Sequence, residues 1–311
     1  MNYKDWRIIF MGTPDFAVAS LQALVEAGCN IVAVVTAPDK PAGRGLQLSE
    51  SAVKKYAVAH NLLVLQPEKL KNEHFISTLK NLQATIQIVV AFRMLPEIVW
   101  NMPPMGTINV HGSLLPQYRG AAPINWAVIN GEIETGVTTF KLKHEIDTGN
   151  ILLQSTLPIT ENETAGEVHD AMKEAGAKLL LQTIQALANN ELQEQTQNSL
   201  LNNSVIKHAP KIFTEHCKID FSKNVEEVHN LIRGLSPFPG AFTFLNNKIL
   251  KIYRSTKEII NHHDEIGKFI SDDKTFLKIV CANGYVHILE LQLEGKKKMK
   301  IEDFLRGHKF N

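Results

Sequence analysis

An amide, an imidazole and a carboxylate lie at the ends of apolar segments in the first half of the chain. Asn109 and His111 alternate with Ile108 and Val110, and Asp147 begins an Asp-Thr-Gly sequence. If the first segment is a strand, both polar side chains leave the same face and can meet one substrate atom together. An amide can stabilise an oxyanion, an imidazole can manage a proton, and a carboxylate can hold the imidazole in one tautomer. These residue types indicate acyl transfer.

No serine or cysteine takes the position of a nucleophile in this set, so the pattern favours direct attack by a substrate amine. We expect His111 to take up and pass the amine proton, or to polarise the acyl oxygen when it is protonated. Asn109 would orient the acyl group and stabilise the oxyanion, and Asp147 would orient His111 or accept a proton through water. Each residue also has a purely structural explanation, since single histidines are often structural and Asn and Asp form turns.

Four motifs, in this order and spacing, resemble those of the folate-dependent formyltransferases. They are Asn109-x-His111, Ser113-Leu-Leu-Pro116, Arg119-Gly-Ala-Ala-Pro123 and Asp147-Thr-Gly149, within a resemblance that runs from Phe10-Met-Gly-Thr-Pro-Asp15 to Asp303-Phe-Leu-Arg-Gly-His308. The resemblance implies that formyl passes from 10-formyltetrahydrofolate, the co-substrate, to an amine. Over its whole length the chain is most similar to members whose acceptor is the α-amino group of methionine on charged initiator tRNA. Such members act in translation initiation.

The resemblance also implies which residues bind the folate. In the family the segment after the catalytic strand lines this site, and its residues here are Ser113, Leu114, Leu115 and Pro116. Its backbone could match the donors and acceptors of the pterin while the two leucines cover the ring. Arg119 could meet a carboxylate or phosphate, or be solvated.

Basic residues in two segments are implied as tRNA contacts. They are Lys40 and Arg44 in the loop at residues 38–45, and Lys296, Lys297 and Lys298 in a run before the C-terminal helix. The loop would engage the acceptor end of the tRNA, with Lys54 and Lys55 as further phosphate contacts, and the run would hold the backbone without reading sequence. A mobile surface loop and a solvated charge run are the alternatives.

Composition predicts an ordinary globular protein of two domains. The chain has 311 residues, of which 44% are apolar and 21% charged. It contains no apolar run of the roughly 18 residues that a membrane helix needs, so we expect a cytoplasmic protein with no membrane partner. Its three cysteines are isolated and show no metal-ligand spacing, which argues against disulfides and a metal site. We also expect a monomer.

Charge is divided unevenly along the chain. Residues 207–311 carry 18 Lys plus Arg against 13 Asp plus Glu, about +5, whereas residues 1–206 carry 15 against 19, about −4. A basic C-terminal part suggests a polyanionic partner, because Lys and Arg neutralise phosphates in nucleic-acid binding. The alternative is an asymmetry that arises by chance, as it does in many proteins.

Periodicity predicts an α/β catalytic domain followed by a smaller β domain. Buried strands are expected at 8–11, 31–35, 86–92, 107–110 and 137–142, and helices at 15–27, 51–61, 70–82, 122–130 and from a capping box at 164–167 to 187. Their alternation indicates a Rossmann-like, doubly wound, mostly parallel sheet over residues 1–206. Residues 189–206 have the composition of a linker. After it, short apolar runs at 241–245, 248–253, 277–281 and 285–293 suggest a basic, OB-like β-barrel over residues 207–311.

Three rival functions can be weighed. The loop after the first strand lacks the glycines of a dinucleotide fingerprint, which excludes an NAD enzyme. A 10-formyltetrahydrofolate-dependent transferase acting on a small amine remains open; the basic loop and the additional C-terminal residues argue against it, because a small acceptor would not need them. A nonenzymatic RNA-binding module also remains open, although the intact Asn109, His111 and Asp147 weigh against it.

Overall fold

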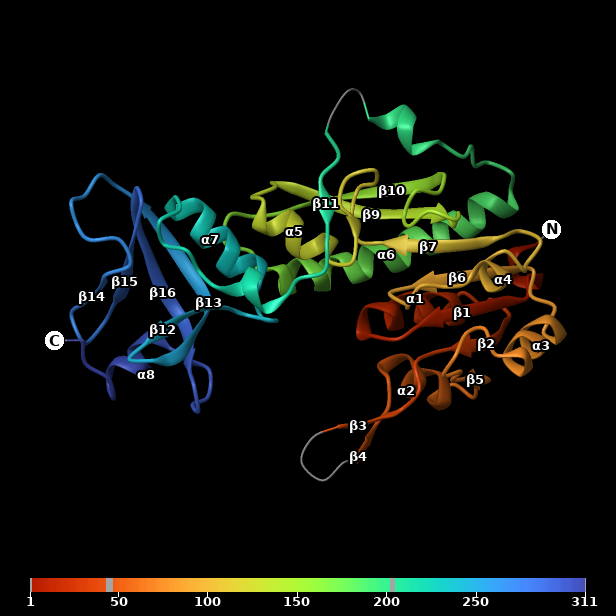
Figure 1. Cartoon of the computed structure of the whole chain (residues 1–311). Helices are drawn as coiled ribbons and strands as arrows, with labels where there is room; N and C mark the ends of the chain where they lie inside the picture. The colour runs from red at the N-terminus through yellow and green to blue at the C-terminus, as the bar shows by residue number, and fades with distance from the viewer. Residues whose placement is uncertain (1, 43–46, 202–204, 311) are drawn as a thin grey trace. The chain divides into compact units, whose positions relative to one another are not determined.

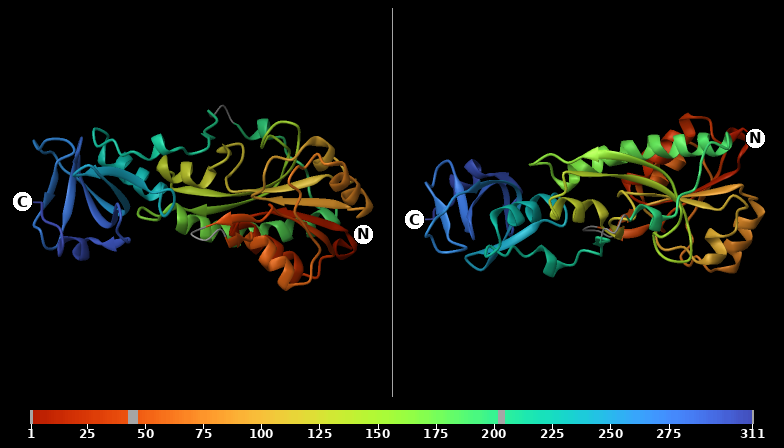
Figure 2. Two further views of the ribbon diagram at one scale, coloured as in Figure 1. Left: turned by 60° about the horizontal axis from the view of Figure 1, so that its bottom comes forward. Right: turned by 90° about the horizontal axis from the view of Figure 1, so that it is seen from above.

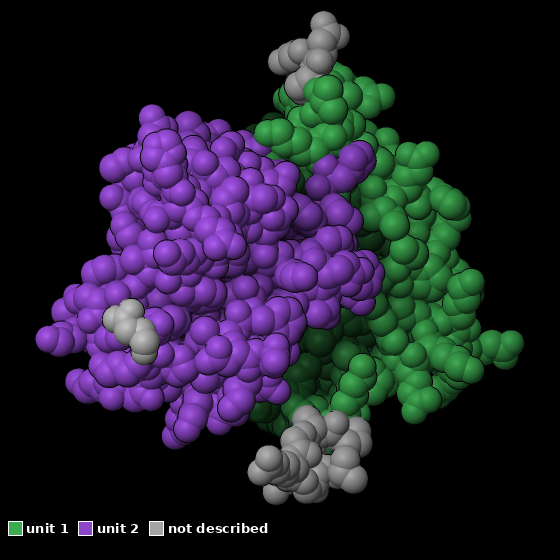
Figure 3. Space-filling model, turned by 60° about the vertical axis from the view of Figure 1, so that its left-hand side comes forward, with its two compact units in different colours: residues 1–119, 136–157, 170–207 green, residues 120–135, 158–169, 208–311 purple. Residues whose placement is uncertain are grey.

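Two compact units make up the chain, and the computed structural model describes residues 2–42, 47–201 and 205–310. The first unit contains residues 1–119, 136–157 and 170–207, and the second contains residues 120–135, 158–169 and 208–311 (Figure 3). The second unit therefore includes two segments from the first half of the chain. The predicted domain limits, residues 1–206 and 207–311, stay a prediction.

The first unit is built on a seven-stranded sheet (Figure 1). Its strands, in spatial order, are β10 (Ile151–Pro158), β9 (Glu134–Lys141), β7 (Thr107–His111), β6 (Ile86–Val90), β1 (Ile8–Gly12), β2 (Ile31–Val35) and β5 (Val64–Leu65). Strands β5, β2, β1, β6 and β7 pair in parallel, whereas β9 runs antiparallel to β7. The chain order reverses on either side of β1, which confirms the predicted doubly wound, mostly parallel sheet.

Helices cover both faces of this sheet. They are α1 (Asp15–Glu26), α2 (Ala52–Ala59), α3 (Glu73–Asn81), α4 (Glu97–Trp100) and α6 (Ala165–Ala188). Figure 2 shows α1 and α6 on one face and α3 and α4 on the other. Side-chain caps mark the beginnings of two of these helices. At the start of α2 the hydroxyl of Ser51 accepts from the backbone N–H of Lys54, and at the start of α6 Thr164 and Glu167 form the predicted capping box.

Two strands of the sheet were not anticipated from sequence. β5 has only two residues, too few for a periodic pattern. β10 is an edge strand in which only the first two residues are buried, and the rest alternate between half-buried and exposed positions. Such a segment lacks the continuous apolar run that marks the central strands.

The second unit contains a six-stranded antiparallel sheet that curls into a half-barrel, in agreement with the predicted small β domain. Its strands are β12 (Ala241–Leu245), β13 (Lys248–Ile259), β16 (Gly284–Leu293), β15 (Leu277–Cys281) and β14 (Phe269–Ser271), with β17 (Met299–Lys300) paired to β16. The helices α7 (Val225–Gly234) and α8 (Ile301–Leu305) bury apolar side chains in the core of this sheet. The unit also holds α5 (Pro123–Ile129) and the short 3₁₀ helix η3 (Thr214–Cys217).

A buried histidine ties α7 to the segment at residues 158–163. Nε2 of His229 donates to the carbonyl of Glu161 at 3.2 Å, and Nδ1 lies 2.9 Å from the hydroxyl of Ser255. Because a carbonyl can only accept, the proton sits on Nε2 and Ser255 donates to Nδ1. Burial lowers the pKa of His229, and the nearby guanidinium of Arg233 acts in the same direction.

Candidate active site

The fold brings together the three residues predicted to do the chemistry. Asn109 and His111 leave one face of β7, while Val110 between them points towards α6, where a Cβ on Gly176 would lie 3.3 Å from its Cγ1. Asp147 lies in the turn between β9 and β10, and its Oδ2 is 3.9 Å from Nδ1 of His111. Strand alternation and the antiparallel return of β9 are sufficient to assemble this group.

A backbone carbonyl determines the tautomer of His111. Nε2 of His111 lies 3.0 Å from the carbonyl oxygen of Tyr118, which can only accept, so Nε2 carries a hydrogen. Nδ1, which faces Asp147, is then the nitrogen that can gain or lose a proton. Tyr118 therefore helps to orient the imidazole, and the orienting role of Asp147 on the opposite nitrogen stays a prediction. The ring is 7% exposed and packs edge-on against Phe140, with ring centroids 6.4 Å apart.

Asn109 is the least constrained of the three side chains. It is half-buried, and within the described residues its side-chain amide makes no hydrogen bond. An amide placed beside an imidazole on one strand face, with its donors available, is suited to an oxyanion that forms between them.

The segment predicted to line the folate site is held by the protein itself. Thr138 Oγ1 donates to the carbonyl of Ser113 at 2.6 Å and accepts from the amide of Leu115 at 3.1 Å and from Gln154 at 2.9 Å. Leu115 is 2% exposed and packs in a cluster with Phe140. Its side chain therefore belongs to the core in this structure.

The remaining members of this segment differ in how accessible they are. The hydroxyl of Ser113 donates to the carbonyl of Gln117 at 2.7 Å, and Pro116 is buried. Leu114 is half-buried and is the member with most surface left for a ligand. The folate contacts of these four residues stay a prediction, in which Leu114 is the side chain best placed to take part.

The basic loop predicted to contact tRNA is described only at its two ends. Lys40 is exposed and begins β3 (Lys40–Ala42), which pairs with β4 (Gln47–Ser49), whereas Arg44 lies outside the described residues. Lys54 binds the carboxylates of Asp39 and Glu50, and this pairing raises the pKa of Lys54. Lys54 is thus less suited to a phosphate contact than its exposed neighbour Lys55.

The C-terminal lysines precede β17 and are all exposed. Lys298 pairs with Glu290 at 3.0 Å, with its Nζ 5.5 Å from the ring centre of Tyr253. Lys296 and Lys297 make no ion pair within the described residues. A polyanion would therefore bind Lys296 and Lys297 more readily than Lys298, because Lys298 would first have to break its ion pair with Glu290.

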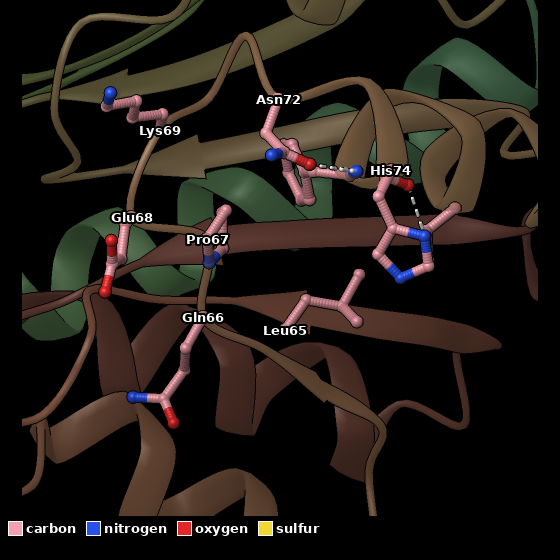
Figure 4. Close-up of a pocket in the computed structure, with 9 residues that line it drawn as sticks. Leu65, Gln66, Pro67, Glu68, Lys69, Asn72 and His74 are labelled. Atoms are coloured by element: carbon pink, nitrogen blue, oxygen red, sulfur yellow. Dashed lines mark hydrogen bonds between the residues drawn. The ribbon is translucent and has the colours of Figure 1, made fainter.

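A separate hollow of about 540 Å³ lies on the first unit between β5 and α3 (Figure 4). It is lined by Leu65, Gln66, Pro67, Glu68, Lys69, Asn72, His74, Phe75 and Thr78. None of the predicted catalytic or folate-contacting residues lines it. The hollow therefore contributes none of the side chains predicted to act in catalysis or folate binding.

Neither a metal centre nor a membrane helix is found in the described ranges. Over residues 2–42, 47–201 and 205–310, no three His, Cys, Asp or Glu side chains are grouped so that they could hold a metal ion. In the same ranges no helix combines the length and the apolar character needed to cross a bilayer.

This chain belongs to the formyl transferase family. The family model described as formyl transferase matches residues 6–184, and the model described as formyl transferase, C-terminal domain, matches residues 211–309. The first match includes Asn109, His111 and Asp147. The family was therefore correctly predicted from the four sequence motifs.

Relatives named methionyl-tRNA formyltransferase match the chain over nearly its full length. The relative from Phocaeicola vulgatus is 53% identical, covering 99% of this chain and 98% of its own, and that from Bacteroides fragilis is 50% identical, covering 99% and 96%. A solved N-formyltransferase from Helicobacter canadensis, in complex with folinic acid and dTDP-3-aminofucose, is 23% identical and has a TM-score of 0.66. The match covers 94% of this chain and all of that one, so the two share a fold over this length.

Proposed function

We propose that the protein transfers the formyl group of 10-formyltetrahydrofolate to the α-amino group of methionine on charged initiator tRNA, in translation initiation. The observation that carries the proposal is the grouping of Asn109, His111 and Asp147 around one reaction position, with His111 Nδ1 facing Asp147 at 3.9 Å. About 50% identity to relatives named methionyl-tRNA formyltransferase supports the choice of acceptor.

The reaction can proceed by direct attack of the neutral amine. The amine nitrogen bonds to the formyl carbon, and the electron pair of the carbonyl bond moves to its oxygen. Asn109 and the Nδ1–H of protonated His111 donate to this oxyanion. In comparable sites, removing one such donor raises the activation free energy by about 3 to 4 kcal/mol. Asp147 accepts the amine proton through water.

Collapse of the tetrahedral adduct completes the transfer. The oxyanion re-forms the carbonyl, the bond to N10 of the folate breaks, and N10 takes the electron pair and the proton that Asp147 received. The amine has a reference pKa of about 7.7 to 8.0, so a useful fraction is neutral near pH 7. Neither a covalent intermediate nor a metal step is needed for this sequence of bond changes.

The folate is expected beside the turn that carries Asp147. The segment from Ser113 to Pro116 is held rigidly by Thr138, so it can act as a wall against which the formyl group is placed. Leu114 would cover the ring, and unused lone pairs of the segment's carbonyls would meet pterin donors. Binding here would leave the formyl carbon within reach of Asn109.

The tRNA would be held by the basic residues outside the catalytic group. Lys40 and Arg44 on the loop, and Lys296, Lys297 and Lys298 before β17, are our proposed contacts. The excess of Lys and Arg in residues 207–311 supports a phosphate backbone as the partner. These contacts would position the charged end without reading sequence.

Transfer of labelled formyl from 10-formyltetrahydrofolate tests the proposal. Methionyl initiator tRNA is compared with uncharged tRNA, free methionine, glycinamide ribonucleotide and an amino sugar nucleotide. We expect label on the charged tRNA alone, and turnover abolished in folded His111→Ala and Asp147→Ala. Label on a small amine would keep the chemistry and reject the acceptor. Near-normal rates in either variant would reject the assigned roles.

A small-amine acceptor is the second candidate function, and one observation favours keeping it. The Helicobacter canadensis N-formyltransferase, solved with an amino sugar nucleotide, has the same fold over 94% of this chain. The C-terminal residues therefore do not by themselves argue for tRNA, contrary to the reasoning from sequence length. A nonenzymatic RNA-binding module would instead show salt-dependent tRNA affinity and no formylated product.

Location and assembly are part of the same proposal. Charged initiator tRNA is used in the cytoplasm, so we place the enzyme there. All three reacting side chains come from one chain, so a monomer supplies a complete catalytic group. Light scattering on the purified protein tests this; a stable dimer would reject it.

A further inference from the structure

Residues 189–201, which we call the strap, are part of the first unit although their composition is that of a linker. Gln195 and Ile151 exchange two backbone hydrogen bonds of 2.8 and 2.9 Å. The carboxylate of Glu194 accepts from the amide of Asn150 at 2.9 Å. The strap is thus attached to the beginning of β10, close in sequence to the turn that carries the predicted catalytic carboxylate.

One strap side chain, Gln197, is buried with all of its polar groups in use. It is 3% exposed, and Nε2 donates to the carbonyls of Asp147 and Gly149 at 2.8 and 2.9 Å. Oε1 accepts from Nε and Nη2 of Arg119 at 2.9 and 2.7 Å. A primary amide has two N–H donors and one oxygen, so this site uses the whole group.

These hydrogen bonds reach the backbone segments that position Asp147 and His111, the two residues proposed to act together. Asp147 has φ = +55°, a left-handed conformation that costs energy for a residue other than glycine, and Gln197 binds carbonyls on each side of Thr148. Arg119 directly follows Tyr118, whose carbonyl holds the imidazole of His111. Gln197 therefore connects the backbone of the carboxylate turn with the segment that orients the imidazole.

We infer that Gln197 is a positioning residue for the transfer reaction: it fixes the placement of the Asp147 carboxylate opposite Nδ1 of His111. The inference rests on the proposed function, because it assigns Gln197 a role through those two residues. Because Gln197 is 3% exposed, we expect it to touch neither substrate. Its effect should appear in the rate of the chemical step and leave acceptor binding intact.

Gln197→Glu and Gln197→Met test the inference, with Gln195→Glu as the matched control. Glu at 197 keeps an acceptor for Arg119 but places oxygen atoms against two carbonyls, and Met removes every hydrogen bond at similar volume. We expect kcat to fall by about tenfold to 100-fold, since small displacements of reacting groups have effects of this size. KM for charged tRNA should stay within about twofold, as should all constants of the exposed Gln195 control.

A pH profile separates positioning from a purely structural role. Lowering the pH protonates the new carboxyl of Gln197→Glu, which gains one O–H that can donate to the carbonyl of Asp147 or Gly149. Its kcat should recover relative to that of Gln197→Met as the pH falls. A structural role would instead lower Tm and the folded fraction, with an unchanged rate per folded molecule and an unchanged profile.

The outcomes distinguish failure of this inference from failure of the proposed function. No transfer by the wild-type chain rejects the proposed function and the inference with it. Wild-type transfer together with normal kcat in both Gln197 variants rejects the inference alone. If both variants fail to fold, Arg119→Lys, which removes the paired donors to Oε1, must lower kcat; a normal rate there also overturns the inference.

Discussion

Replacing Asp147 with Asn tests the electrostatic part of the mechanism without disturbing the turn. Asn tolerates the left-handed conformation of this residue, and the backbone carbonyl that accepts from Gln197 is unchanged. The substitution removes the negative charge opposite His111. A structural defect is therefore not expected, and a fall in rate can be read as lost stabilisation of charge.

The size of the effect follows from the separation of the two groups. At the 3.9 Å between Oδ2 of Asp147 and Nδ1 of His111, a charge pair is worth ~1 kcal/mol in water and ~4 kcal/mol at an effective dielectric constant of 20. These energies correspond to a fall in kcat of about fivefold to about 1000-fold. The side chains are 12% and 8% exposed, which places the expected loss in the upper part of this range.

Single-turnover transfer of labelled formyl to methionyl initiator tRNA, at saturating folate, measures the chemical step directly. Glu145→Gln is the matched control, because it neutralises an exposed carboxylate in the same turn. We expect Glu145→Gln to react at the wild-type rate and Asp147→Asn to be slow, with equal Tm values. A rate for Asp147→Asn within twofold of wild type would show that its charge has no part in the reaction.

Three further predictions concern the supports of the site and its partner. Thr138→Val should lower the free energy of unfolding in urea by about 1 to 3 kcal/mol, because it leaves buried hydrogen-bonding groups unpaired. The pKa of His229 is lower in the folded state than in the unfolded state, so the unfolded state binds more protons at low pH. The free energy of unfolding should therefore fall as the pH drops below about 6.5. In thermal melts, His229→Gln should show a smaller change of stability with pH. Lys296→Ala with Lys297→Ala should raise KM for charged tRNA and reduce its salt dependence by about two counterions, whereas Lys298→Ala should have a smaller effect.

Much of the arrangement of the proposed catalytic group could be predicted, because it depends on local rules. Strand alternation alone places Asn109 and His111 on one face of β7, and a buried apolar run predicts the strand itself. Asp147 could be named from its motif, and its approach to His111 follows from β9 returning antiparallel beside β7. The alternation of strands and helices likewise predicted a doubly wound, mostly parallel sheet, although not the order of its strands.

The groups that support the site could not be predicted, because they act through backbone atoms or over long separations. The carbonyl of Tyr118 has no sequence signature, since every residue has one. Gln197 lies 50 positions after Asp147 in a stretch rich in Gln, Asn and Glu, where its burial is invisible to composition. The folate contact of Leu115 stays a prediction, because a leucine that covers a ring and one that fills a core have the same sequence pattern.

Surface side chains, and not the presence of a second unit, can discriminate between a tRNA and a small amine as the acceptor. A protein solved with an amino sugar nucleotide shares this fold over 94% of the chain. This likeness shows the fold alone, so the surface chemistry of the second unit is the feature that can discriminate a small amine from a tRNA. The exposed Lys296 and Lys297 fit a polyanion, whereas an amino sugar nucleotide would require a pocket that holds two phosphates close to Asn109. Removing these two lysines should consequently weaken transfer to charged tRNA and leave folate binding unchanged. An unaltered KM for charged tRNA would contradict the proposed contacts and favour a small amine as the acceptor.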